Sequence, residues 1–187
     1  SKLENYVFVP ALLISTFSNN CTVKSIMQDW KLVVYSILAL AIAFCISLPL
    51  SNLFAKKGTY QKNIYKYALT FGNFGFMGNA IVPAILGSVF GDSVLYYYLL
   101  FTLPLQTAVN TWGIYVLIPK ENRQGSPLKN LINPIFISII IGMLLGLTGF
   151  GEKLPSFITD VLSNCSNCMA PVAMILTGFI VGGYNFK

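Results

Sequence analysis

Long apolar stretches separated by short charged segments make up almost the whole chain. Six intervals contain no Lys, Arg, Asp or Glu, namely 5–23, 32–55, 67–91, 93–119, 130–151 and 161–186. A helix needs about 20 consecutive apolar residues to cross the hydrocarbon core of a bilayer. Each interval therefore predicts one transmembrane helix. We number these spans one to six, and the pattern predicts an all-α polytopic membrane protein.

The composition supports a membrane protein and narrows its chemistry. Of the 187 residues, 55% are hydrophobic and 10% are charged, with a mean hydropathy of +0.69, whereas soluble domains carry about 25% charged residues. The chain contains no His, which excludes Ser-His and Cys-His catalysis and His-ligated zinc. No acid lies within the six intervals, which argues against an intramembrane aspartyl protease. We therefore expect neither an enzyme nor a bound metal or cofactor, and we interpret Cys165-x-x-Cys168 as packing residues.

Basic residues indicate which loops face the cytoplasm. The loop at 56–66 holds four Lys and no acid, and the loop at 119–132 holds three basic residues and one acid. The alternate loops are poorer in basic residues, so we expect these two loops to be cytoplasmic in an integral protein of the cell membrane. The net charge of +6 mostly reflects this bias. A nucleic-acid-binding face is the alternative, but it would need a soluble basic surface, so we expect no nucleic acid partner.

Aromatic residues lie near the starts of several predicted spans. Trp30 stands at the start of span two, and Tyr96, Tyr97 and Tyr98 follow one another near the start of span four. Tyr and Trp favour the headgroup level of a bilayer because their apolar rings carry one polar group. Packing inside a helix bundle explains some of these residues equally well.

Span three combines small, polar and helix-breaking residues in its middle. They are Gly72, Asn73, Gly75, Gly78, Asn79 and Pro83. Proline removes a backbone donor, and glycine lowers the cost of leaving helical geometry. In lipid, freed backbone groups are tolerated only where protein or a water-filled cavity satisfies them, and such broken helices form the substrate sites of many transporters. The pattern predicts substrate binding at Asn73, Gly78, Asn79 and Pro83, with helix packing as the alternative.

Spans four to six carry further polar and small residues. Gln106 and Asn110 share one helix face, because residues four apart are neighbours. This face either lines a cavity beside the broken span or bonds to neighbouring helices. Spans five and six contain Gly142-x-x-x-Gly146 and Gly178-x-x-x-Gly182, a spacing that lets helices cross closely. Packing within the chain is the favoured use of both pairs, and a homodimer interface is the alternative.

Four segments, in matching order, resemble the auxin efflux carrier family of membrane transport proteins, which includes plant PIN-type carriers and bacterial malonate or malate carriers. The segments are Val9–Leu13, Gly72–Gly78, Asn133–Pro134 and Ala170–Gly178. They resemble parts of the family's second, fourth, sixth and seventh helices, and the resemblance covers nearly the whole chain. One departure is that the family's Met-Gly-x-Pro pattern is replaced by Met77-Gly78-Asn79-Ala80, with the proline later, at Pro83.

The resemblance implies a fold of ten helices in two inverted repeats of five. This chain would hold helices two to seven as an internal part of a longer protein. Most of the first repeat is then 1–118, followed by the loop at 119–132 and the start of the second repeat at 133–187. Span three becomes the broken crossover helix, whose second half we expect to begin near Asn79. Spans one, five and six would form a scaffold, and spans two to four would move.

The function that the resemblance implies is secondary transport, as an efflux carrier, of small organic anions such as carboxylates across the lipid bilayer. The positive end of a helix and the Asn amides would hold the carboxylate without a buried cation. Two alternatives remain open. One is an intramembrane enzyme whose catalytic residues lie outside this chain, and the other is a membrane scaffold or receptor that does not transport.

Overall fold

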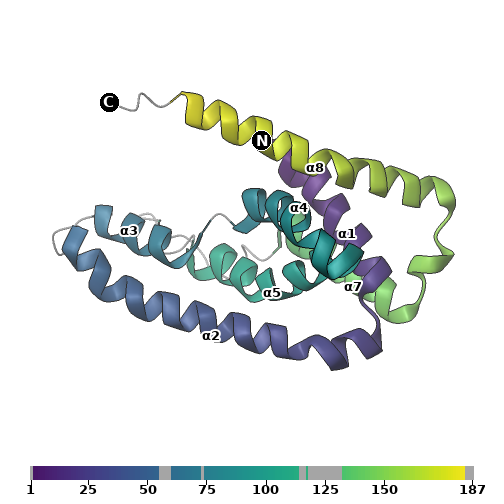
Figure 1. Cartoon of the computed structure of the whole chain (residues 1–187), viewed down its shortest axis with the longest axis horizontal. Helices are drawn as coiled ribbons and strands as arrows, with labels where there is room; N and C mark the ends of the chain where they lie inside the picture. The colour runs from purple at the N-terminus through teal and green to yellow at the C-terminus, as the bar shows by residue number, and fades with distance from the viewer. Residues whose placement is uncertain (1, 55–59, 73, 114–116, 118–131, 184–187) are drawn as a thin grey trace. The chain divides into compact units, whose positions relative to one another are not determined.

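Helices account for the whole of the described architecture (Figure 1). The computed structural model describes residues 2–54, 60–72, 74–113, 117 and 132–183. Within these ranges there is no strand, so the all-α fold class is confirmed. The chain forms two compact units, which are residues 1–29, 73–99 and 133–187 (unit 1) and residues 30–72 and 100–132 (unit 2).

Long α-helices alternate with short helical turns of wider or tighter geometry. In chain order the elements are η1 (Glu4–Phe8), α1 (Val9–Asn20), α2 (Val23–Phe54), α3 (Tyr60–Thr70), η2 (Phe74–Gly78), α4 (Asn79–Phe90), η3 (Gly91–Ser93), α5 (Val94–Ala108), η4 (Val109–Gly113), α7 (Pro134–Thr148), η7 (Gly151–Lys153) and α8 (Ser156–Gly182). The wide π-type turns η1 and η2 run directly into α1 and α4, and η4 directly follows α5.

Two of the described helices, α2 and α8, are long and apolar enough to cross a membrane, while α4 and α7 are apolar but shorter. Every one of the six apolar intervals contains helix, but membrane crossing by six helices stays a prediction. Part of the loop at 56–66 and nearly all of the loop at 119–132 lie outside the described residues.

In unit 1, α1 packs along α7 (Figure 1). The two helices approach closely because Gly142 and Gly146 of α7 face α1 without side chains. A Cβ on Gly146 would lie 2.5 Å from the carbonyl oxygen of Phe17. The first small-residue motif therefore serves packing within the chain, as predicted. At Gly178 and Gly182 of α8 a Cβ would meet no atom within 4 Å, so the second motif contacts nothing among the described residues.

Local sequence sets both ends of α7. Asn133 is the N-cap, and its Oδ1 accepts a hydrogen bond from the Phe136 N–H at 2.9 Å. Pro134 follows at the first helical position, where the missing N–H has no intrahelical partner to lose. At the other end, Gly149 has a φ of 70°, the left-handed conformation that glycine commonly adopts after a helix.

The interior of unit 1 also contains a carboxylate. Glu4 in η1 has no exposed surface, and it is the one charged residue that is buried among those whose burial is described. The η1 turn packs against α1, α7 and α8, which encloses this side chain. Because the apolar interval begins only at residue 5, the charge pattern does not place Glu4 in the interior.

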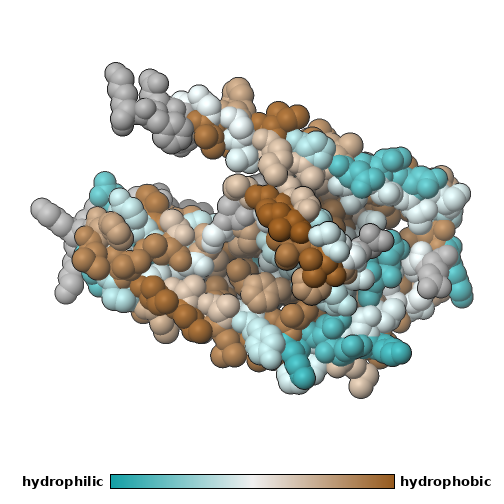
Figure 2. Space-filling view, in the orientation of Figure 1, coloured by the Kyte–Doolittle hydropathy of each residue, from teal (hydrophilic) through white to brown (hydrophobic). Residues whose placement is uncertain are grey.

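In unit 2, a buried polar contact joins α2 to the end of α3. The Thr70 hydroxyl lies 3.0 Å from the Ser47 hydroxyl and 2.7 Å from the Lys66 carbonyl oxygen. Ser47 in turn donates to the Phe44 carbonyl oxygen at 2.8 Å. Elsewhere α2 exposes hydrophobic side chains over much of its surface (Figure 2). This surface suits a helix that faces lipid or other apolar helices.

Candidate functional site

Span three is interrupted, but earlier than expected. The α3 helix ends with Thr70, residues 71–72 are not helical, and helical geometry resumes with η2 at Phe74. Gly78 has helical angles, with φ −63° and ψ −45°, and η2 continues into α4 without a gap. The second half of the span therefore begins at Phe74 and not near Asn79, so that part of the prediction is wrong by about one turn.

A tyrosine from α5 contacts the turn that follows the interruption. The Tyr98 hydroxyl donates a hydrogen bond to the Phe74 carbonyl oxygen at 2.6 Å. The same hydroxyl lies against Gly78, in the space that a Cβ would fill. Tyr98 thus contacts the first and the last residue of η2. The missing side chain at Gly78 serves this contact, and the turn itself stays helical.

Asn79 is the predicted site residue whose environment best suits ligand binding. It is the first residue of α4, and it is half-buried. Its side-chain amide has no hydrogen-bond partner among the described residues. Pro83 lies one turn further along α4, and because proline has no N–H, the Asn79 carbonyl lacks the donor that another residue would supply. Asn73 lies outside the described residues.

The two residues predicted to line a cavity lie in unit 2, whereas Gly78, Asn79 and Pro83 lie in unit 1. Gln106 of α5 and Asn110 of η4 are both half-buried. The Asn110 amide donates to the Gln106 carbonyl oxygen at 2.8 Å, so one of its two N–H groups bonds to the preceding helical turn. The Gln106 side chain has no hydrogen-bond partner in the described part of the chain.

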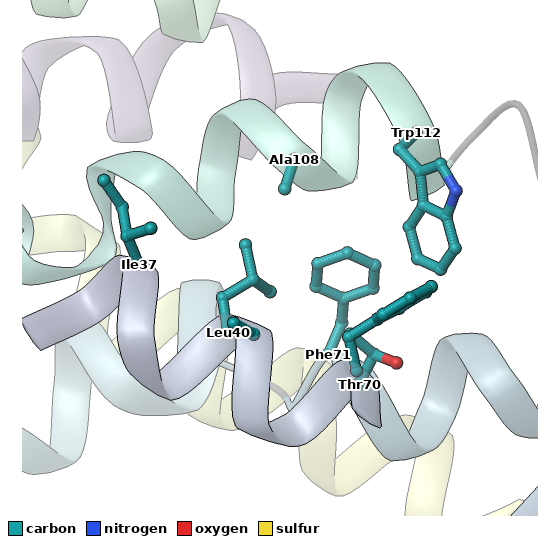
Figure 3. A pocket seen from close by; sticks show the side chains of 8 residues that line it. Ile37, Leu40, Thr70, Phe71, Ala108 and Trp112 are labelled. Carbon is teal, nitrogen blue, oxygen red and sulfur yellow. The ribbon is translucent and has the colours of Figure 1, made fainter. Parts of the chain in front are cut away.

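An apolar cavity of about 350 Å³ lies within unit 2 (Figure 3). It is lined by Ile37, Leu40, Ala41, Phe44, Thr70, Phe71, Ala108 and Trp112. The Trp112 ring meets Phe44 edge-on with centroids 5.1 Å apart, and its centroid lies 5.8 Å from that of Phe71. The one hydroxyl in the lining, on Thr70, is already hydrogen-bonded. The cavity therefore suits an apolar group better than a carboxylate, and none of the predicted site residues lines it.

The described part of the chain offers hydrogen-bonding groups but no cluster of metal-ligating side chains. In this part, no three His, Cys, Asp or Glu side chains lie where they could hold a metal ion. All four cysteines have free thiols, and of these only Cys21 is buried. The packing interpretation of Cys165-x-x-Cys168 is therefore not supported, because Cys168 is exposed on α8 and Cys165 is partly so. Amides and hydroxyls of this kind can bind a ligand without transforming it.

Comparison with known proteins gives one match. The profile of a protein family described as membrane transport protein matches residues 1–185 of the chain. No curated protein and no solved structure matches the chain significantly. The family match extends over both units and all six predicted spans, so it bears on the whole chain.

Proposed function

The chain belongs to the membrane transport protein family, which includes the auxin efflux carriers, and we propose that it is a secondary transporter that exports small organic anions such as carboxylates. Family membership supports transport and speaks for a protein that is not an enzyme. The observation that carries the substrate proposal lies in span three. The span is interrupted, and directly after η2 the half-buried residue Asn79 has a side-chain amide that makes no hydrogen bond within the described fold.

The start of the second half of span three offers a carboxylate two kinds of donor. The first N–H groups of a helix have no intrahelical partner and carry the positive end of its dipole. Here that end begins at Phe74. In this proposal Asn73 and Asn79 add side-chain amides on either side of η2, while Gly78 and Pro83 shape the backbone between and after them. Neutral amides and backbone N–H groups would hold an anion without a buried Lys or Arg.

The grouping of the helices fits part of the expected architecture. The helices of spans one, five and six, which the family resemblance assigns to a scaffold, all fall within unit 1. Unit 1 also contains the second half of span three and the start of span four, which the resemblance assigns to the moving part. We propose that helices outside this chain complete two inverted repeats, and that the exposed small-residue motif of α8 faces those helices or a second copy of the protein.

We place the transporter in the cell membrane, with the loops at 56–66 and 119–132 in the cytoplasm. The distribution of Lys and Arg supports this orientation. The exposed apolar surfaces of α2 and α8 would then contact lipid or neighbouring helices. Lipid and a small organic anion are the partners that this proposal requires.

Transport by the full-length protein in proteoliposomes, with labelled malonate and malate as probes, tests the function. Asn79→Ala should lower affinity by about ten- to a hundredfold, because a hydrogen bond to a charged group contributes roughly 1.5–3 kcal/mol. Asn52→Ala is a matched control, since the Asn52 amide donates to the Leu48 carbonyl oxygen of its own helix at 3.1 Å. The control should transport like the wild type.

Each outcome of this experiment decides between roles of Asn79 or between classes of function. Unchanged affinity in a stably folded Asn79→Ala protein would remove this residue from the site. Loss of folded Asn79→Ala protein, with normal affinity in the fraction that remains, would assign Asn79 to helix packing. Binding without flux would favour a receptor, and chemical conversion of the probe would favour an enzyme.

A further inference from the structure

We propose that Tyr98 is a positioning residue that fixes η2, the first turn of the second half of span three, and that Gly78 is the matching surface for its hydroxyl. The inference rests on the proposed function for its consequence, which is the placement of Asn79 against the substrate. The contact itself is a property of unit 1 and does not depend on what the protein transports.

The three consecutive tyrosines of α5 have three different environments. Tyr96 is 2% exposed and packs edge-on against Phe17, with ring centroids 6.1 Å apart. Tyr97 is 37% exposed. Tyr98 is half-buried, and its hydroxyl reaches the Phe74 carbonyl oxygen at 2.6 Å. Successive residues of a helix point about 100° apart, so the three rings cannot share one role. The bond to η2 is specific to Tyr98.

The geometry of the contact fixes η2 at both of its ends. At Phe74 the Tyr98 hydroxyl donates to the backbone carbonyl oxygen, so the hydrogen bond does not involve the Phe74 side chain. At Gly78 the hydroxyl fills the position that any side chain would need, and ring atom Cζ would lie only 2.6 Å from a Cβ. A wide turn is less favourable than regular α-helix and persists where something holds it. Tyr98 supplies that constraint.

Asn79 directly follows η2, the turn that Tyr98 contacts. Its backbone position is set by Gly78, to which it is covalently joined, and its side chain has no other hydrogen bond within the described residues. If the Tyr98 hydroxyl is removed, η2 is free to relax toward other helical geometries, and the Asn79 amide then moves with it. Tyr98 would therefore influence substrate affinity without contacting the substrate.

The first test compares Tyr98→Phe with Tyr97→Phe in the purified full-length protein. Hydrogen–deuterium exchange of the peptide that covers residues 74–83 measures how firmly the turn is held. Tyr98→Phe should speed exchange there by about two- to tenfold, which is the effect of one neutral hydrogen bond. Malonate or malate affinity should fall by a similar factor. Tyr97→Phe removes a neighbouring hydroxyl and should change neither quantity.

The second test is a double-mutant cycle between the two sides of the contact. Gly78→Ala places a methyl group where the Tyr98 hydroxyl lies, so it should disturb η2 about as much as loss of the hydroxyl does. Tyr98→Ala makes room for that methyl group. The double variant should therefore exchange like Tyr98→Ala alone, whereas residues that do not interact give additive effects.

The exchange data decide whether Tyr98 fixes η2, and the probe affinity decides whether this contact positions the site. Wild-type exchange at 74–83 in Tyr98→Phe, or additive effects in the cycle, would overturn the inference, even if transport of the probes is confirmed. Faster exchange and non-additive effects in a protein that binds neither malonate nor malate would support the contact between Tyr98 and η2. They would count against the proposed substrates. Faster exchange with unchanged probe affinity would show that the contact between Tyr98 and η2 does not position the site.

Discussion

The close crossing of α1 and α7 gives the sharpest prediction about stability. Gly146→Ala would place a Cβ 2.5 Å from the carbonyl oxygens of Phe17 and Cys21, whereas ordinary contact begins at 3.4 Å. The two helices would have to separate by up to 3.4 − 2.5 = 0.9 Å. The overlapping atoms belong to the backbone, so no change of side-chain rotamer can relieve the overlap.

The size of the effect follows from two opposing contributions. Overpacking of a well-packed contact costs about 1–3 kcal/mol, and the rigid backbone places Gly146→Ala at the upper end of that range. Replacing Gly by Ala within a helix stabilises it by about 1 kcal/mol. We therefore expect a net loss of about 2 kcal/mol in the free energy of unfolding for Gly146→Ala.

Two other glycines provide a graded comparison in the same assay. A Cβ at Gly142 would lie 3.0 Å from the Phe17 Cβ and 3.1 Å from the nearest backbone atoms of α1, so Gly142→Ala should have a smaller effect than Gly146→Ala. A Cβ at Gly178 would meet nothing within 4 Å, so Gly178→Ala should be neutral or slightly stabilising.

The midpoint of thermal unfolding measures this order of stability. It is determined for the purified protein in detergent, with size-exclusion chromatography as the readout of folded protein. The midpoint should be lowest for Gly146→Ala, intermediate for Gly142→Ala, and at or above wild type for Gly178→Ala. An unchanged midpoint for Gly146→Ala would show that α1 and α7 do not approach as described. A large loss for Gly178→Ala would show that the α8 motif is packed against a partner.

Three further predictions concern a cap, a buried contact and the topology. Asn133→Ala should destabilise the protein by about 1 kcal/mol, since it removes the N-cap of α7, and chemical denaturation measures the loss. Thr70→Val should cost about 1 kcal/mol by leaving α2 without its buried polar contact, while Thr70→Ser should retain most of it in the same assay. Single cysteines at Gly58 and Gly125, in a background without the native cysteines, should not react with an impermeant thiol reagent added outside cells. A single cysteine at Gly91 should react. The reverse pattern would invert the predicted topology.

Helix positions were the most predictable part of the fold, because charge-free length is enough to locate an apolar helix. The two small-residue motifs show where this information stops. Gly142-x-x-x-Gly146 and Gly178-x-x-x-Gly182 have the same spacing, yet only the first meets a neighbouring helix among the described residues. Spacing describes one surface, and packing requires a second surface that a single sequence does not identify.

The interruption in span three was predictable in kind but not in position. Glycines, asparagines and a proline predict that the helix breaks, and it does. The turn that follows the break is contacted by Tyr98, which lies 24 residues from Phe74 along the chain. The sequence left two uses open for the tyrosines, at the headgroup level or in packing inside the bundle, and Tyr98 has a packing contact. A useful signal was present, because three consecutive aromatic residues on a helix point in different directions and cannot all face one layer of the bilayer.

The apolar cavity of unit 2 could not have been found from periodicity. Its lining residues on α2 belong to an almost uniform apolar run, in which nothing distinguishes Leu40 from its neighbours. The other walls come from Phe71 and Trp112, which are far from α2 in sequence. Only the packing of the three segments brings these aromatic rings together (Figure 3).

Hydrogen bonding separates polar residues that the fold uses from those that it leaves for a ligand. Thr107, Asn110 and Thr111 each donate to a carbonyl oxygen of their own helix, which is a common way for polar side chains to satisfy themselves in a helix. A hydroxyl whose one proton is used in this way must break that bond before it can donate to a substrate, and Asn110 has one of its two amide N–H groups engaged. Asn79 and Gln106 are half-buried, and their side-chain amides have no partner within the described residues. These amides can bond to a ligand without first giving up a bond within the fold, which makes them better candidates for substrate contacts than the amide of Asn110.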